Sequence, residues 1–164
     1  MEQLTNLVIS DRELAVISTA LNKLMNDTNA TSVMLLDKSG QVIASQGTGV
    51  RHNATSLGAL LAGAFSSSRH IAELLGEKDF RTIFQQGLHE NIYTTMIGEQ
   101  WLLVIVFDKL THIGLVKVLS KKASDEMGRI LERVRADTSR TKSSVINVQF
   151  RSSVEDTIDL LFRD

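Results

Sequence analysis

The sequence predicts a single α/β domain whose elements follow the order helix, two strands, helix, three strands, helix. Apolar residues recur at helical spacing in three segments, and short apolar runs bounded by turn residues lie between them. The chain has 164 residues, about the length of one domain, with 43% hydrophobic and 23% charged residues. This balance is typical of a protein that buries one core.

The first helix is expected from Asp11 to Asp27, because Ser10 and Glu13 have the spacing of a capping box. Apolar residues follow it at helical spacing: Leu14, Ile17, Leu21, Leu24 and Met25. A buried strand is expected over 31–37 and its hairpin partner over 41–46, with a tight turn at Lys38-Ser39-Gly40.

The second helix is expected from Thr55 or Ser56 to Gly76, a good C-terminal cap. Three strands should follow, over 80–85, 91–97 and 101–107. The last is apolar at every position, so it should be a central strand that is covered on both faces. A third helix is expected over 111–136, and one apolar stripe runs along it: Leu115, Leu119, Ala123, Met127, Ile130 and Val134.

The chain changes character after this domain, which spans residues 1–137. Ser, Thr and charged residues become frequent, and we expect a linker over 138–152. Apolar residues then return at helical spacing and predict a short C-terminal amphipathic helix over 153–164: Val154, Ile158, Leu161 and Phe162.

Motifs of catalysis and ligand binding are missing. The absence of cysteine excludes disulfides, thiolate nucleophiles and Cys-based metal sites. Neither the P-loop Gly-Lys-Ser/Thr nor the Gly-x-Ser-x-Gly elbow occurs, and no two histidines have the spacing of a zinc helix. His112 and Asp108 could imitate a base and its orienting acid, but we interpret them as polar residues around the start of the third helix. We therefore expect no catalytic residue, metal or cofactor, and a function in binding other proteins.

Charge and hydropathy limit the partners further. The net charge of −1 gives no global attraction to nucleic acid. Residues 109–142 carry nine Lys or Arg against four Asp or Glu, which we interpret as a solvated helix face, with a docking patch for an acidic protein or anionic lipid as the alternative. The start resembles no secretory signal and no apolar run could cross a bilayer, so we expect a cytoplasmic protein without membrane insertion.

The second helix is amphipathic in an unusual way. One group of apolar residues is expected to pack on the sheet: Leu57, Leu61, Ile71, Leu74 and Leu75. The other side is nearly bare of long side chains: Ala59, Ala62, Gly63, Ser66 and His70. Gly63 costs about 1 kcal/mol relative to Ala in mid-helix. We interpret this side as a contact platform that another backbone approaches closely; a neutral surface or a site under a neighbouring loop is the alternative.

Several short segments, in the same order along the chain, resemble the Roadblock/dynein light chain family, in particular its bacterial members that regulate a Ras-like GTPase. The segments are Leu36-Asp37-Lys38-Ser39-Gly40-Gln41 with Ile43, Thr55-Ser56-Leu57, Ala62-Gly63, Leu75-Gly76-Glu77, Val106-Phe107-Asp108, Gly114-Leu115-Val116, Lys121-Lys122-Ala123-Ser124-Asp125-Glu126, Ile158-Asp159 and Leu161-Phe162. The resemblance implies a five-stranded central antiparallel sheet with helices on both faces.

The resemblance also implies a homodimer, in which the second helices lie side by side and the third strands pair edge to edge. The paired helices would receive one Ras-like small GTPase, so two copies of this chain would bind each GTPase. The implied GTPase-binding surface consists of Ala59, Ala62, Gly63, Ser66, Arg69 and His70. The dimer would speed GTP hydrolysis by fixing the switch loops of the GTPase, without inserting an arginine. Arg51 and Arg69 are then steering or rim charges.

The tail helix would dock in a groove of the same GTPase. The resemblance points to a cell-polarity or motility system, with a cell pole as the candidate place of concentration. Two other functions stay open at this point. One is an adaptor that localises its partner without changing hydrolysis, and the other is a small-ligand sensor with a similar sheet.

Overall fold

The computed structural model describes residues 9–50 and 53–161. Residues 11–129 form one compact unit, and the part of the last helix from Ile130 onward belongs to a second unit. The elements, in chain order, are α1 (Asp11–Thr28), β1 (Ser32–Asp37), β2 (Val42–Gly47), α2 (Ala54–Leu74), β3 (Thr82–Gln86), β4 (Glu90–Ile97), β5 (Trp101–Asp108) and α3 (Ile113–Leu161). This order confirms the predicted fold.

The five strands form one sheet in the order β2-β1-β5-β4-β3, and every neighbouring pair is antiparallel. β5 lies in the middle and is buried at every position from Trp101 to Phe107, as its continuous apolar sequence predicts. β2 and β3 form the two edges of the sheet.

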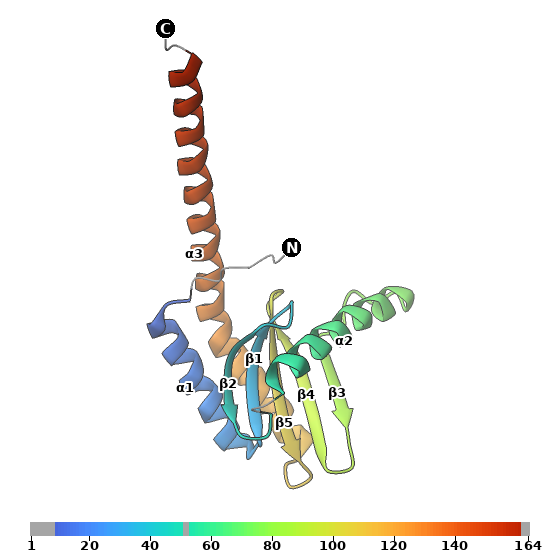
Figure 1. The fold of residues 1–164 in the computed structure, drawn as a ribbon. Coiled ribbons are helices and arrows are strands. Elements are labelled where there is room, and N and C mark those ends of the chain that lie inside the picture. The colour runs from blue at the N-terminus through green and yellow to red at the C-terminus, as the bar shows by residue number, and fades with distance from the viewer. Residues whose placement is uncertain (1–8, 51–52, 162–164) are drawn as a thin grey trace. The chain divides into compact units, whose positions relative to one another are not determined.

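Helices cover both faces of the sheet (Figure 1), with α2 on one face and α1 and the start of α3 on the other. The strand register explains how side chains divide between the faces: Met34 pairs with Val104 and points to one face, and Val33 pairs with Ile105 and points to the other. The core on the α2 side consists of Met34, Leu36, Leu61, Met96, Leu102, Val104 and Val106. α1 turns its own buried stripe inward: Ile17, Leu21, Leu24 and Thr28.

The turn between β1 and β2 sets the start of α2. The Asp37 carboxylate accepts hydrogen bonds from the backbone N–H of Ser39 at 2.9 Å and of Gln41 at 3.0 Å, which closes the turn. Gly40 follows with a φ of +94° and lies against Gly58 in the second turn of α2. The hairpin and the helix are therefore in direct backbone contact.

α3 is longer than expected, because it continues as a helix through residues 138–152, where we predicted a linker. The chain has no proline and no glycine beyond Gly128, and Ser and Thr cost a helix only a few tenths of a kcal/mol each. The Ser, Thr and charged residues of 138–152 therefore do not end the helix. The division into domain, linker and tail helix stays a prediction.

The buried side of α3 also differs from the predicted stripe. Val116, Ser120, Ala123 and Met127 are buried, whereas Leu115 is exposed. The stripe is thus shifted by one residue at its start. Within residues 9–50 and 53–161, no helix combines the length and the apolar character that a membrane span requires.

Candidate protein-binding surface

The inward side of α2 holds the helix on the sheet. Ala54, Leu57 and Phe65 pack against the core cluster that contains Leu61. Further along the helix only small residues are buried on this side, namely Ser68 and Ala72. α2 is therefore fixed mainly through its first three turns.

The outward side of α2 carries the residues predicted to bind a GTPase. Ala59, Gly63, Ser66, Arg69 and His70 are exposed, and Ala62 is half-buried. A Cβ added to Gly63 would meet nothing within 4 Å, so no contact within the described chain requires a glycine there. The structure thus brings the predicted stripe to one open surface.

Three apolar residues of α2 are exposed where we expected them to pack on the sheet: Ile71, Leu74 and Leu75. The helix turns by about 100° per residue, so Leu74, which lies three turns after Gly63, is on the same outward side as that glycine. The exposed fraction of Leu74 is 88%. Our grouping of these leucines with Leu57 and Leu61 was therefore wrong.

The sequence reasoning also missed Leu60, whose exposed fraction is 73%. Leu60, Gly63, Ser67, Ile71 and Leu74 are spaced three or four residues apart and share one line along the helix. This spacing is present in the sequence, and it could have been used to predict that Leu60, Ile71 and Leu74 share the side of Gly63. The open side of α2 consequently carries small residues in its middle and exposed apolar residues along its flank.

Charge enters this surface only at its C-terminal end. No charged residue occurs between Asn53 and Ser68, and Arg69 is the first cation. His70 Nδ1 lies 3.4 Å from Glu73 Oε2 along the same helix, which makes an ion pair when the imidazole is protonated. Arg51 lies outside the described residues. The neutral middle of α2 can accept a partner without desolvating a charge.

β3 presents a second open surface, the edge of the sheet. The N–H of Gly87 donates to the carbonyl of Glu90 at 3.0 Å, and the N–H of Met96 donates to that of Arg81 at 2.9 Å. Because hydrogen-bonded pairs alternate in an antiparallel ladder, the N–H of Phe84 points away from β4. The Phe84 ring stacks on Phe107 with 6.2 Å between centroids. The outward backbone of β3 can therefore pair with another strand.

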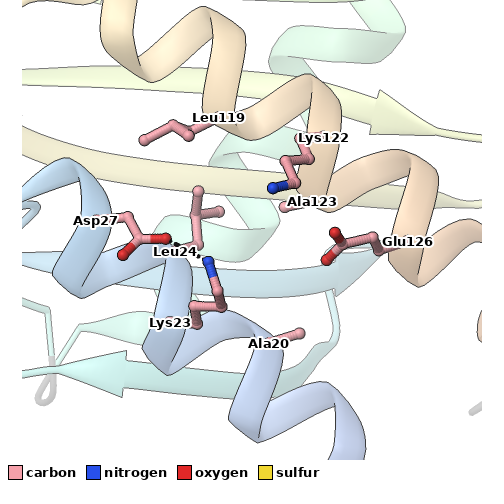
Figure 2. Close-up of a pocket in the computed structure, with 8 residues that line it drawn as sticks. All are labelled: Ala20, Lys23, Leu24, Asp27, Leu119, Lys122, Ala123 and Glu126. Atoms are coloured by element: carbon pink, nitrogen blue, oxygen red, sulfur yellow. Dashed lines mark hydrogen bonds and ion pairs between the residues drawn. The ribbon is translucent and has the colours of Figure 1, made fainter.

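A small pocket lies between α1 and α3, with a cavity of about 20 Å³, room for roughly one water molecule. Figure 2 shows Lys23 reaching toward Asp27 on α1, with Lys122 and Glu126 contributed by α3. The Lys23 Nζ to Asp27 Oδ2 hydrogen bond of 2.5 Å and the charge of Asp27, with a smaller effect of Glu126, raise the pKa of Lys23. A cavity that has room for about one water molecule does not favour a small-ligand sensor.

The remaining residues predicted from the sequence are Asp108, possible metal ligands and the apolar residues of the tail. Asp108 accepts a hydrogen bond from the backbone N–H of Leu110 at 2.8 Å, which fits a residue that shapes a turn. In the part of the chain that the structure describes, no three His, Asp or Glu side chains gather as metal ligands. In the tail, Ile158 and Leu161 are exposed, whereas the side chain of Val154 and all of Phe162 lie outside the described residues.

Comparisons with known proteins identify relatives of this fold. Residues 16–107 match the Roadblock/LC7 domain. No curated protein matches the chain in sequence. Among solved structures, Myxococcus xanthus MglB is similar at 38% identity over 78% of this chain and 96% of its own, with a TM-score of 0.72.

Two further solved structures are similar. The gliding protein MglB of Thermus thermophilus has 30% identity over 78% of this chain and 97% of its own, with a TM-score of 0.73. An MglB with a tetrameric arrangement has 29% identity over 79% of this chain and 97% of its own, with a TM-score of 0.74. The family match covers more than half of the chain, and the strand order and helices agree with it; the chain belongs to the Roadblock/LC7 family.

Proposed function

We propose that this chain is a homodimeric regulator of an MglA-type Ras-like small GTPase and that it accelerates GTP hydrolysis. The observation that carries the proposal is the open side of α2, where Ala59, Gly63 and Ser66 lie exposed in a row without a long side chain. The similarity to MglB supports the assignment of the partner class.

The surface has the chemistry of a protein contact. Small residues in its middle let another backbone approach closely, and Leu60, Ile71 and Leu74 supply apolar area along its flank. A short side chain loses little rotamer entropy when a partner binds. Arg69 at the end of the neutral stretch acts as a rim charge that steers the encounter.

The homodimer would form through the edge of β3 and through α2. The outward N–H and carbonyl groups of β3 can continue the sheet into a second copy. The exposed leucines of α2 would then be covered in part by the α2 of the second copy. Two neighbouring α2 helices give a platform wide enough for one GTPase, so two chains would serve each GTPase.

Acceleration of hydrolysis would come from the placement of switch loops. Residues that position water and stabilise charge in GTP hydrolysis belong to the GTPase, and a partner can raise the rate by holding those loops in their active arrangement. The first turns of α2, which carry Ala59 and Gly63, are anchored on the sheet by Leu57, Leu61 and Phe65. No arginine of this chain is required to enter the nucleotide site.

The tail helix would add a second contact. Ile158 and Leu161 are exposed, and with Val154 and Phe162 they would form an amphipathic face for a groove of the GTPase. The cytoplasm, with concentration at a cell pole in a polarity or motility system, is the setting this function would have.

The test is GTP hydrolysis by the cognate MglA-type GTPase, measured with and without this protein. The proposal expects faster hydrolysis that saturates at two chains per GTPase. Tight binding without a change in hydrolysis would favour the adaptor function and contradict the activator.

A further inference from the structure

The two halves of α2 are held on the sheet to different degrees. The first half, residues 54–65, packs large apolar side chains on the core, and Leu61 in its middle is 5% exposed. In the second half, residues 66–74, Ser68 and Ala72 are buried and every other residue is exposed. Because a hydroxymethyl and a methyl group remove little apolar area from water, the second half gains little from packing on the sheet.

The sequence of the second half also favours a helix only weakly. Three consecutive serines begin it, and serine has a lower helix propensity than alanine. The last turn contains Glu73 and no basic residue, so its charge opposes the helix dipole. Isolated helices shorter than about 12 residues are marginal in water. The second half therefore depends on the first half and on contacts with other molecules.

The ends of this weakly held segment are defined by the structure. Phe65 is the last large side chain of α2 that packs on the core. One turn earlier, Gly63 is exposed, and a Cβ there would meet nothing within 4 Å. At the other end, the N–H of Glu77 donates to the carbonyl of Ala72 at 2.9 Å, and Gly76 ends the helix with a φ of +72°. The segment between Phe65 and Gly76 can consequently unwind without exposing a large core side chain.

The exposed side of the second half is apolar. The exposed fraction is 52% for Ile71 and 88% for Leu74, and Leu75, directly after the helix, is 68% exposed. In Figure 1, α2 begins near the hairpin of β1 and β2 and runs toward the β3 side of the sheet. A second copy that pairs along β3 would bring its own α2 next to these residues. Burial of Ile71 and Leu74 against that helix would supply the packing that the second half lacks.

We propose that residues 66–74 unwind and refold as a unit in a single chain, and that a second copy of this chain holds them helical. The inference rests on the homodimer of the proposed function and adds a consequence of forming it. Local opening of a segment requires few buried apolar contacts and little support from its neighbours, and residues 66–74 meet both conditions.

The consequence concerns the surface assigned to the GTPase, which is divided between the two halves of α2. Ala59, Ala62 and Gly63 belong to the first half, and Ser66, Arg69 and His70 belong to the second. This surface is then complete only in the dimer. A single chain binds the GTPase in proportion to the fraction of chains in which the second half is helical.

The experiment is amide hydrogen exchange followed by NMR, on the unmodified chain and on F84P, in which proline blocks pairing along β3. In monomeric F84P, we expect the amides of residues 66–74 to share protection factors at least about tenfold lower than those of residues 57–62. In the unmodified dimer, the two groups of amides should agree within about threefold. F84A, which keeps the N–H, should behave like the unmodified dimer.

Dilution provides single chains without a substitution. Exchange measured by mass spectrometry at falling concentration should show residues 66–74 losing protection as the dimer dissociates.

A pair of variants tests whether the helix of residues 66–74 is what opens. In the F84P background, S66A/S67A should slow exchange of these residues by up to about fivefold, because alanine favours the helix, and should leave residues 57–62 unchanged. T19A/N22A is the matched control, since it raises helix propensity at exposed positions of α1 and should not affect α2.

The inference is overturned by equal protection of residues 66–74 in F84P and in the unmodified dimer, or by S66A/S67A without effect. A steady fall of protection from residue 57 to residue 74 also overturns it, since that pattern indicates fraying of a helix end. An unmodified dimer with unprotected residues 66–74 overturns it and leaves the proposed homodimer intact. If light scattering shows the unmodified chain to be a monomer, the homodimer is contradicted together with the closing by a second copy.

Discussion

Gly40 and Gly58 meet backbone to backbone, so that a Cβ on Gly58 would lie 2.4 Å from the carbonyl oxygen of Gly40. One glycine belongs to the turn between β1 and β2, and the other to α2. This contact between two residues without side chains holds the start of α2 against the hairpin. The outward side of the same helix is the surface that we propose to bind a GTPase.

Substitution of Gly58 by alanine should destabilise the protein by about 1–3 kcal/mol, because the new methyl group overlaps a backbone atom that cannot rotate away. Urea unfolding followed by circular dichroism measures the loss. A G58A variant as stable as the unmodified chain would show that the hairpin and α2 are not in contact there.

Substitution of Gly63 by alanine should have the opposite effect on folding. The position is open, so the better helix propensity of alanine should raise the free energy of unfolding by up to about 1 kcal/mol. The same methyl group should weaken binding of the GTPase, measured by titration. Unchanged affinity would mean that no partner backbone approaches Gly63.

Proline at Phe84 should yield a folded monomer. The Phe84 N–H points away from β4, so proline removes no bond within the described sheet but blocks pairing with a second β3. Light scattering gives the oligomeric state. F84A is the matched control, since it also loses the stacking on Phe107 but keeps the N–H, and it should remain a dimer. Two variants of equal oligomeric state would argue against pairing through β3.

Deletion of residues 143–164 should weaken binding of the GTPase and leave the dimer intact, because the tail would be a second contact with the partner. Titration and light scattering measure the two properties. A monomeric product would show that the tail holds the dimer together.

Much of this fold could be predicted from the sequence. Strand β5 was evident because Trp101 to Phe107 are all apolar, and the turn at Gly40 was evident from its residues. The residues of a single segment were sufficient to predict these elements, since burial on both faces leaves a continuous apolar run and a required positive φ leaves a glycine.

The orientation of α2 beyond its first turns was harder to predict. Leu74 was assigned to the sheet because it is apolar, but an apolar residue can serve a contact with another molecule as well as the core. The length of α3 was missed for a related reason: Ser and Thr lower helix propensity without ending a helix, and residues 138–152 contain no residue that breaks one. The spacing of apolar residues in one chain does not distinguish residues of the core from residues that contact another molecule.

The central claim, that the outward side of α2 activates a GTPase, is tested most directly by single-turnover GTP hydrolysis with three proteins. The unmodified chain should accelerate hydrolysis by the MglA-type GTPase. S66R should abolish the acceleration, because a long charged side chain would block close approach at an exposed position of the platform. A15R adds the same charge at an exposed position of α1 and should accelerate like the unmodified chain. Equal acceleration by S66R and A15R would contradict the account.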